Sequence, residues 1–505
     1  MSAITRPVLI GVGQRSQRDV TLETAQNPLE MLTERAHDAA ESSGAGPQLF
    51  ESIDTIALTS TLGWPAQNPV RLLADSLGAS PAAEYVSEVG GETPVVLLNE
   101  VSTRIAAGQS ELAFVGGCNN VKSLGLALSA GVQLDWPSGG AGTATIIGKP
   151  GRGSDDDEEA VGLGMPISIY PIFENALRAA RGQSLEEHRK AMGALFHPFT
   201  QVAAKNPHAW YPTERSPEEL VYPTRLNRMI DFPYPKYLNA VLATEQSAGL
   251  LVASEEMARR LGVPEENWIY WRGGAIAIED PWKFSERPSL AEGPAIATCH
   301  RTALANAALD LDEIDLIDFY SCFPVAVAMA CEMLGLSQDD PRGFTLTGGL
   351  PYAGGPGNSY SLHSIAAAVD QLREKRGEHA LVTGNGWYLT KHSAAVLSRQ
   401  PGANDHRPNA NPATEATRAA WKADPVRLVA QASGPASVET YTIVYDRDGD
   451  PARGIIVGRL TDTNERFLAN TPEDPRLLAD LAKLEVIGTT GTVGRDDGKN
   501  LFLPS

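Results

Sequence analysis

The sequence predicts a layered α/β fold made of two similar halves, followed by a small all-β unit. The first observation is a repeat, because the buried-strand pattern RPVLIGVGQ at residues 6–14 returns as IYWRGGAIAI at residues 269–278. The second is a change of composition at residues 400–424, which are rich in Pro, Asn and Ala and lack periodicity. The third is the pattern beyond residue 425, where apolar and polar residues alternate between turn signals.

Further pieces of the two halves match in the same order. SIDTIAL at residues 52–58 parallels EIDLIDF at residues 313–319, and a predicted helix ending in Leu-Gly follows each. A second helix comes next in each half, with apolar residues at helical spacing. AGQSELAFVGG at residues 107–117 then parallels RGEHALVTGNG at residues 376–386. Alternating strands and helices favour a largely parallel sheet in each half, and the duplication favours a pseudo-twofold axis with one central cleft.

These patterns divide the chain into five units. They are an N-terminal half of residues 1–119 and 238–266, a loop domain of residues 120–237, a C-terminal half of residues 267–399, a linker of residues 400–424, and an OB-like β-barrel of residues 425–505. An insertion of this size over a cleft is typical of a lid or substrate-binding domain. Its acidic run at residues 154–159 is predicted to be a solvated, mobile loop.

Composition and charge exclude several classes of protein. The chain has 505 residues and a net charge of −20, which argues against nucleic-acid binding. Four cysteines without metal-type or disulfide-scaffold spacing predict no metal site and a reducing compartment. The sequence contains no apolar run of membrane-spanning length, and its first apolar run is too short for a signal segment. We therefore expect a cytoplasmic protein.

A glycine-rich stretch at residues 343–357 leads into the second helix of the C-terminal half. Its six glycines permit positive φ angles and close backbone approach. A loop of this kind before a buried helix directs backbone N–H groups and a positive dipole end toward whatever occupies it. Gly91, at the start of the helix at residues 94–107, holds the equivalent place in the first half. We expect the two loops to meet at one pocket; the alternative is a tight irregular turn.

Taken together, residues 5–398 resemble the thiolase superfamily, and most closely the sterol-carrier-protein-type thiolases and thiolase-like proteins with an additional C-terminal domain. The resemblance rests on the duplicated halves, on GGLPYAGGPG (residues 348–357) at the place of the family's glycine-histidine-proline loop, and on DFYSCF (residues 318–323) at the place of its Asn-Glu-Ala-Phe or His-Asp-x-Phe motif. It implies a five-layer αβαβα fold, a loop domain over the active site and binding of acyl-CoA. In typical members one cysteine is acylated, a histidine activates it, and a second cysteine acts as acid and base.

The sequence departs from that machinery at each position. The nucleophile position is Gly91, the histidine position is Gly355, and no cysteine follows Cys331 to serve as the second catalytic cysteine. Acyl-cysteine chemistry needs a thiolate and a base within hydrogen-bond reach. We therefore expect no cysteine-dependent thiolysis, although backbone N–H groups at Gly91, Gly384 and Gly386 could still bind an oxyanion.

The remaining candidate catalytic residues are Tyr320, Cys322, His363 and His392. Tyr320 takes the Asn or His position of the family motif, and a tyrosine there resembles the aldolase branch, whose members cleave β-hydroxyacyl-CoA and work with an OB-fold partner. Activity near neutral pH would require donors or cations that stabilise a phenolate, and the glycine-rich loop is the expected source of donors. The alternatives are a core tyrosine, an inert buried thiol and two structural histidines.

The candidate substrate-binding residues are Gly91, Asn239, Val241, Tyr352, Gly354, Gly355, Gly384 and Gly386. Residues 239–241 match the Asn-Ala-Ser-Gly turn that touches CoA in the family, with Val241 in place of the serine. Coenzyme A or an acyl-CoA is the expected small-molecule ligand. No covalently bound cofactor is expected, and the chain is expected to be a monomer or a homodimer.

Three functions stay open at this stage. The first is a CoA-thioester-binding protein of the acetyl-CoA acetyltransferase family without the usual Cys/His/Cys set. The second is a retro-aldol lyase that acts on a β-hydroxyacyl-CoA through Tyr320. The third is a non-catalytic CoA-binding or scaffold protein in lipid metabolism.

Overall fold

The computed structural model describes residues 5–402, 411 and 414–505. Its largest element is a ten-stranded sheet in the order β10-β11-β12-β9-β1-β8-β4-β2-β3-β5. The strands are β1 (Pro7–Ser16), β2 (Thr55–Leu58), β3 (Ala83–Ser87), β4 (Leu112–Asn119), β5 (Thr145–Ile147), β8 (Gln246–Ser254), β9 (Ile269–Ile278), β10 (Leu316–Asp318), β11 (His379–Gly386) and β12 (Lys391–Ser398).

The strand order shows the predicted duplication. Outward from the middle, β1-β8-β4-β2 on one side mirrors β9-β12-β11-β10 on the other. The sequence repeat matches β1 to β9, β2 to β10 and β4 to β11. The matched strands occupy equivalent positions in the two half-sheets. The ladder between β1 and β9 joins the two half-sheets, and it pairs Val8 with Tyr270 and Leu9 with Ile269. The pseudo-twofold axis therefore passes between β1 and β9.

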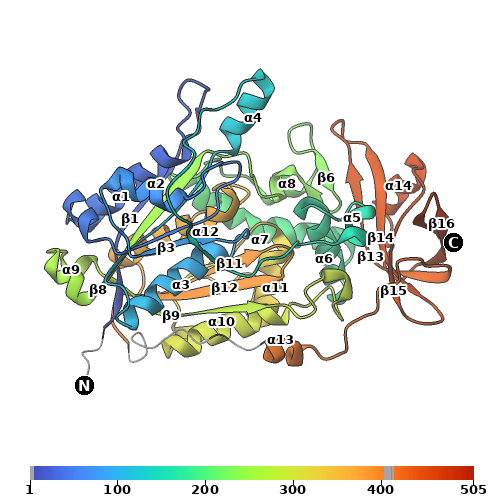
Figure 1. Ribbon diagram of the computed structural model, residues 1–505. Helices are drawn as coiled ribbons and strands as arrows, with labels where there is room; N and C mark the ends of the chain where they lie inside the picture. The colour runs from blue at the N-terminus through green and yellow to red at the C-terminus, as the bar shows by residue number, and fades with distance from the viewer. Residues whose placement is uncertain (1–4, 403–410, 412–413) are drawn as a thin grey trace.

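Helices form three layers around the two half-sheets (Figure 1). The helices α3 (Thr93–Ala106) and α12 (Tyr360–Arg373) lie between the half-sheets and share one apolar core with strands of both. The helices α1 (Pro28–Ser43) and α2 (Pro69–Leu77) cover the outside of the N-terminal half-sheet. The helices α10 (Pro294–Ala307) and α11 (Pro324–Leu334) cover the outside of the C-terminal half-sheet, and α9 (Glu255–Arg260) follows β8. This is the expected αβαβα arrangement.

The predicted Leu-Gly helix ends are confirmed in both halves. The helix α2 ends at Gly78 and α11 ends at Gly335, with φ angles of 67° and 73°. A glycine adopts this left-handed conformation without the steric cost that a Cβ atom adds. The chain can then reverse toward the next strand in each half.

The inserted segment between the halves is mostly helical. Besides β5, which joins the ten-stranded sheet, its helices and strands are α4 (Val121–Ala130), α5 (Asp156–Ala160), α6 (Pro166–Ala180), α7 (Leu185–Lys205), α8 (Pro217–Val221), β6 (Met229–Asp231) and β7 (Tyr234–Pro235). The acidic run forms the short helix α5 and not the predicted loop, while Asp156, Asp157 and Glu159 are exposed to solvent as predicted. Asp155 caps α5 in a capping box with Glu158, and the buried Glu158 carboxylate accepts a hydrogen bond from the Ser285 amide at 3.3 Å.

The C-terminal strands close into a five-stranded barrel, as predicted. The strands are β13 (Gly434–Tyr445), β14 (Pro451–Leu460), β15 (Arg466–Asn470), β16 (Thr490–Asp496) and β17 (Lys499–Pro504), and α14 (Pro475–Leu481) packs beside them. The barrel closes because β14 pairs with both β15 and β13. The β6–β7 hairpin of the insert extends this sheet through the pair Val444 and Asp231, which the sequence did not indicate.

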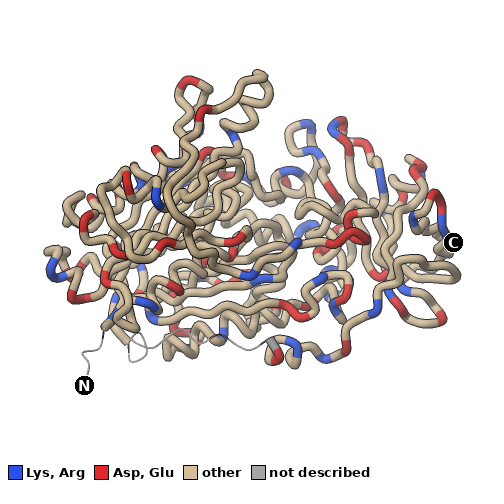
Figure 2. Tube along the Cα trace, in the orientation of Figure 1, with Lys and Arg blue, Asp and Glu red and all other residues tan. Residues whose placement is uncertain are grey.

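The barrel and the α/β body lie at opposite ends of the molecule (Figure 1). Part of the predicted linker, residues 403–410 and 412–413, lies outside the described residues; α13 (Thr414–Ala420) follows it. Acidic positions are distributed over both the body and the barrel (Figure 2), so the charge of −20 does not mark one binding face. Among the described residues, none of the helices combines the length and apolar character that crossing a bilayer requires.

Candidate functional site

Tyr320 and Gly91 lie in contact where the two halves meet. A Cβ atom added at Gly91 would overlap the Tyr320 hydroxyl oxygen, and it would lie 2.5 Å from Tyr320 Cζ and 2.6 Å from the Asn385 carbonyl oxygen. No side chain fits in so close an approach without displacing its neighbours. The Tyr320 hydroxyl therefore fills the space that a nucleophilic side chain at position 91 would need.

A buried ion pair fixes the turn that carries Gly91. Lys391 Nζ lies 2.5 Å from Glu92 Oε1, and each side chain is 2% exposed. Lys391 also donates to the Val89 carbonyl at 2.8 Å, and Ser393 Oγ donates to the Glu92 carbonyl at 2.8 Å. Burial raises the pKa of Glu92, and Lys391 opposes that shift by favouring the carboxylate.

The predicted binding residues Gly384 and Gly386 lie against Glu92. A Cβ atom at Gly384 would lie 2.7 Å from Glu92 Cα, and one at Gly386 would overlap Glu92 Oε2. Their lack of side chains lets β11 approach the Gly91 turn. These glycines therefore have a packing role that spacing alone did not indicate.

Tyr320 is held as a neutral phenol. Its amide donates to Thr383 Oγ1 at 2.9 Å, and its ring lies edge-on to Tyr360 at 5.5 Å between centroids. The hydroxyl makes no hydrogen bond to any residue in the described part of the chain. Although Tyr320 keeps some solvent exposure, desolvation of the phenol raises its pKa well above the usual range, and Cys322, Tyr360 and Glu92 add to the rise.

The glycine-rich loop does not supply the expected donors to Tyr320. The Gly348 amide donates to Thr345 Oγ1 at 2.9 Å, and the Gly355 amide donates to the Val241 carbonyl at 2.9 Å. The expectation of a stabilised phenolate is therefore wrong, because these N–H groups are engaged and the surroundings disfavour negative charge. Near neutral pH, Tyr320 can donate a proton or a hydrogen bond.

Cys322 lies beside two polar residues that sequence reasoning missed. Asn385 Nδ2 donates to the Tyr170 hydroxyl at 2.8 Å and lies 3.9 Å from Cys322 Sγ. The Tyr170 ring stacks on Phe323 at 4.4 Å between centroids. Burial raises the pKa of Cys322 to about 12. No local signal marked Tyr170, because it comes from α6 of the insert; Asn385 lies in the TGNG segment where the family's second cysteine is absent.

Asp318, two residues before Tyr320, holds the glycine-rich loop in place. Its carboxylate accepts hydrogen bonds from the Leu346 amide and the Ser364 hydroxyl, both at 2.7 Å. Burial raises the pKa of Asp318 to about 6. The loop is thereby tied both to β10 and to α12. Asp318 belongs to the DFYSCF motif, but no pattern of neighbouring residues distinguishes it.

The remaining predicted binding residues surround the same loop. The amide of Ala240 donates to the Cys322 carbonyl at 3.0 Å, and the amide of Val241 donates to the Leu350 carbonyl at 3.3 Å, so residues 239–241 run along both motifs. Asn239 Nδ2 is bonded to the Pro235 carbonyl at 2.8 Å.

Phe196 of the insert and Gln246 of β8 pack against the glycine-rich loop. The Tyr352 ring lies edge-on to Phe196 of α7, and a Cβ atom at Gly354 would overlap the Gln246 side chain. The loop's far end meets the Gly91 turn, because the Gly90 amide donates to Asn358 Oδ1 at 2.9 Å. The two loops therefore meet, while their opening onto one shared pocket stays a prediction.

The two candidate histidines lie at separate small cavities. His392 and Tyr320 line one of about 20 Å³, and His363 lines another of about 10 Å³ with Gln14 and Gly354. Burial lowers the pKa of each histidine to about 3, so both are neutral near pH 7. The larger of the two cavities has room for about one water molecule, not for an acyl chain. Within the described residues, no cluster of His, Cys, Asp and Glu is suited to a metal ion.

Comparisons with known proteins agree on the fold. Residues 418–499 match the family model for the thiolase-like protein type 1 additional C-terminal domain. A monomeric SCP2-thiolase-like protein type 1 from Mycobacterium smegmatis has a crystal structure similar to this chain. It shows a TM-score of 0.84 and 37% identity, and the match covers 99% of this chain and 99% of that chain.

More distant relatives match smaller shares of this chain. A structure of acetyl-CoA acetyltransferase from Syntrophomonas wolfei has a TM-score of 0.56 and 13% identity over 79% of this chain and 100% of that chain. An Ltp2–ChsH2(DUF35) aldolase has a TM-score of 0.59 and 18% identity over 78% of this chain and 97% of that chain. Acetyl-CoA acetyltransferase from Methanocaldococcus jannaschii is 19% identical over 336 residues, covering 66% of this chain and 77% of that protein.

The contact between Gly91 and Tyr320 predicts coupled stability effects. We expect Gly91→Ala to lower the free energy of unfolding in urea by about 1–3 kcal/mol, the usual cost of overpacking. In a Tyr320→Ala background the same change should cost at least about 0.5 kcal/mol less, because the overlapping ring is gone. Gly125→Ala is the control, since a Cβ atom there meets nothing within 4 Å. Additive costs for Gly91 and Tyr320 would contradict the contact.

The carboxyl of Asp318 predicts a pH dependence of stability. The folded pKa of Asp318 is about 6, above the ordinary value of 3.8. The contribution of its neutral carboxyl to the free energy of unfolding is therefore fully present below pH 3.8 and is lost as the pH rises through 6. The Asp318→Asn variant should therefore gain about 3 kcal/mol relative to wild type between pH 3.8 and 7. Unfolding free energies across that range measure it. Asp340→Asn should show the opposite slope, mainly below the ordinary value of 3.8, because Arg342 and the other hydrogen bonds lower the pKa of Asp340 despite some desolvation.

Proposed function

Because the chain belongs to the SCP2-thiolase-like proteins of type 1, we propose that it binds CoA thioesters without performing cysteine-dependent thiolysis. The contact between Gly91 and the Tyr320 hydroxyl carries this proposal. A neutral hydroxyl stands where an acylated nucleophile would be, and adding a side chain at position 91 would require the ring to move. The proposed state is a monomer, as in the Mycobacterium smegmatis relative.

The state of the cysteines supports the absence of thiolysis. All four cysteines of the sequence are buried, and none forms a disulfide. Burial raises the pKa of Cys118, Cys322 and Cys331 to about 12, and that of Cys299 further. The thiolate, not the thiol, is the nucleophile. None of these sulfur atoms is therefore poised to form an acyl-enzyme at neutral pH.

A CoA thioester is the proposed ligand class because of the named activity of the relatives and the place of residues 239–241. That segment hydrogen-bonds to Cys322 and to Gly355, and thus borders both motifs that surround Tyr320. We propose that the insert moves to widen the cavity of about 20 Å³ at Tyr320. The insert is tied to the glycine-rich loop, since the amides of Trp210 and Tyr211 bond to the carbonyls of Ala353 and Tyr352 at 3.0 and 2.8 Å. In this proposal the thioester is bound after that segment opens.

The second candidate function is a retro-aldol cleavage of a β-hydroxyacyl-CoA. The unbonded hydroxyl of Tyr320 favours it, and one structural relative is named an aldolase. In this reaction a base removes the β-hydroxyl proton, the bond between Cα and Cβ breaks, and an aldehyde or ketone leaves. Tyr320, as a neutral phenol, would give its proton to the Cα of the thioester enolate. His392 lines the same cavity as Tyr320, but burial lowers its pKa to about 3, so its imidazole is a poor base for this step.

Calorimetric titration with acetyl-CoA and longer acyl-CoA esters tests the first function. We expect saturable binding together with an unchanged intact mass of the protein after incubation, because no thiolate is available. A mass increase of one acyl group, lost on substituting a cysteine, would overturn the absence of thiolysis. If none of the CoA esters binds, the ligand class is wrong.

Substituting Tyr320 tests the second function. With β-hydroxyacyl-CoA substrates and detection of the released carbonyl compound, Tyr320→Phe should reduce turnover about a hundredfold or more, the scale of one general acid. Ester affinity should change little, because the ring remains. Cys322→Ala is the matched control and should be nearly neutral. If Cys322 is essential and Tyr320 is dispensable, the result indicates a cysteine mechanism. If the unsubstituted protein shows no turnover, the lyase function is wrong and only ligand binding is supported.

A further inference from the structure

The turn between β11 and β12 holds two residues in a costly backbone conformation. Trp387 and Leu389 have φ angles of 54° and 52°, although neither is a glycine. A left-handed conformation is rare for bulky residues and persists only where the surroundings impose it. The strained turn, residues 387–389, lies just after Asn385 and just before Lys391.

Both neighbours of the strained turn act on the Gly91 turn. The Asn385 carbonyl packs against Gly91, and Lys391 holds Glu92 through the buried ion pair. A shift of the strained turn would therefore be transmitted to the Gly91 turn from two sides. The position of the site depends on whatever fixes residues 387–389.

Arg287 is a main anchor of the strained turn. Its guanidinium donates to the Tyr388 carbonyl at 3.0 Å and to Thr390 Oγ1 at 2.8 Å. The side chain of Arg287 is 1% exposed. Tyr170 adds a third bond, from its hydroxyl to the Trp387 carbonyl at 2.9 Å. Because one arginine spans two positions of the turn, the place of its own backbone matters.

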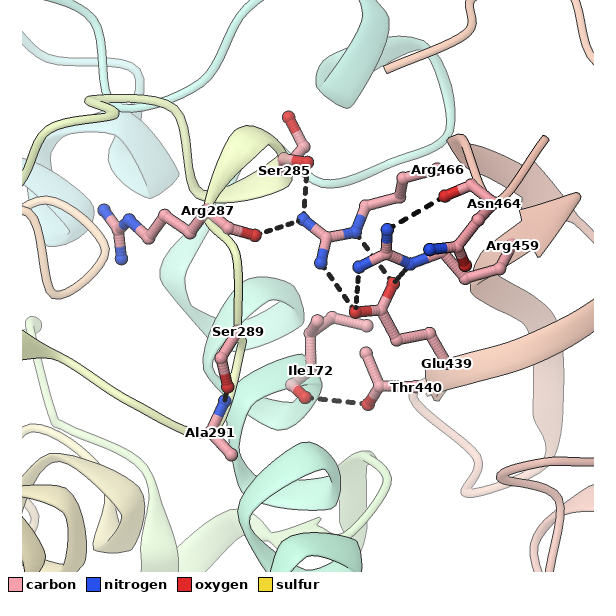
Figure 3. A network of polar contacts seen from close by, with 10 residues as sticks. All are labelled: Ile172, Ser285, Arg287, Ser289, Ala291, Glu439, Thr440, Arg459, Asn464 and Arg466. Atoms are coloured by element: carbon pink, nitrogen blue, oxygen red, sulfur yellow. Dashed lines mark hydrogen bonds and ion pairs between the residues drawn. The ribbon is translucent and has the colours of Figure 1, made fainter. Parts of the chain in front are cut away.

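The backbone of Arg287 is held by the C-terminal barrel. Arg466, at the start of β15, points out of the barrel toward residues 285–287 (Figure 3). Its Nη1 donates to the Ser285 and Arg287 carbonyls, both at 2.7 Å. Its Nε and Nη2 bind the Glu439 carboxylate at 2.8 and 2.6 Å. Arg466 is fully buried, so each of its donors has to be matched within the protein.

We propose that the C-terminal barrel is a brace for the candidate site. Through Arg466 it fixes residues 285–287; Arg287 then fixes the strained turn, and the strained turn sets Asn385 and Lys391 around Gly91. Arg466 and Arg287 are positioning residues in this scheme. The brace is a property of the folded chain and does not depend on which reaction or ligand the site serves.

Arg459 provides a matched control for Arg466. It binds the same Glu439 carboxylate at 2.7 and 2.9 Å, but its other hydrogen bond goes to the Asn464 carbonyl within the barrel (Figure 3). A lysine keeps the charge at either position but lacks the planar fork that reaches two carbonyls and a carboxylate together. Arg466→Lys thus weakens the contact with residues 285–287, whereas Arg459→Lys changes only contacts inside the barrel.

Hydrogen–deuterium exchange of the full-length chain, followed by mass spectrometry, tests the brace. In Arg466→Lys we expect exchange in peptides covering residues 386–392 to rise about tenfold while barrel peptides over residues 451–470 keep their protection. Arg459→Lys should leave residues 386–392 unchanged. The brace is overturned if Arg466→Lys loosens only residues 282–290 or the barrel, or if both lysine variants affect the strained turn equally.

A second variant covers the case in which Arg466→Lys does not fold. Thr390→Val removes one of the two bonds that Arg287 makes to residues 388 and 390, together with the 3.2 Å bond from the Thr390 hydroxyl to the Tyr388 carbonyl, without touching the barrel. It should raise exchange in residues 386–392 and leave residues 285–287 and the barrel at wild-type rates. Wild-type exchange of residues 386–392 in Thr390→Val would overturn the proposed link between Arg287 and the strained turn.

Discussion

The pairing of β1 with β9 is the constraint on which the site depends. Two residue pairs join the half-sheets, and the equivalent elements of the two halves are then related by the axis between these strands. The helices α3 and α12 consequently share one layer, and the turns that precede them meet where Gly90 bonds to Asn358. The two loops lie far apart in the sequence, and it is the symmetric pairing of the half-sheets that brings them together.

Buried charged groups position this site, while the candidate reactive groups are neutral. Glu92 is paired with Lys391, Glu439 with Arg466, and the Asp318 carboxyl is surrounded by hydrogen-bond donors. Partnered charges of this kind specify one arrangement, because breaking a pair leaves an uncompensated buried charge. Tyr320 and Cys322, by contrast, have raised pKa values and carry no charge near neutral pH. Such a site suits hydrogen bonding and proton donation better than attack by an anionic nucleophile.

The fold was largely accessible from the sequence, whereas the environment of each site residue was not. The repeat, the Leu-Gly helix ends and the alternating C-terminal pattern are local features, and each predicted its element correctly. The loop predicted at residues 154–159 is a short helix instead. The prediction rested on charge alone and did not take into account the capping box formed by Asp155 and Glu158. The interpretation of the glycine-rich loop as a free donor site failed for Tyr320, since its N–H groups bond to Thr345 and Val241 instead.

Residue identity alone establishes that position 91 lacks a nucleophile, that position 355 lacks a histidine, and that a tyrosine begins the motif at residues 320–323. That the Tyr320 hydroxyl takes the place left at Gly91, with Asn385 against Gly91 and Tyr170 bonded to Asn385, depends on the folded arrangement. The difference arises because sequence patterns are local, whereas the contacts of the site join segments that are distant in the chain. Residue identity and periodicity are fixed along the chain, whereas close packing and desolvation depend on atoms that meet only after distant segments have folded together.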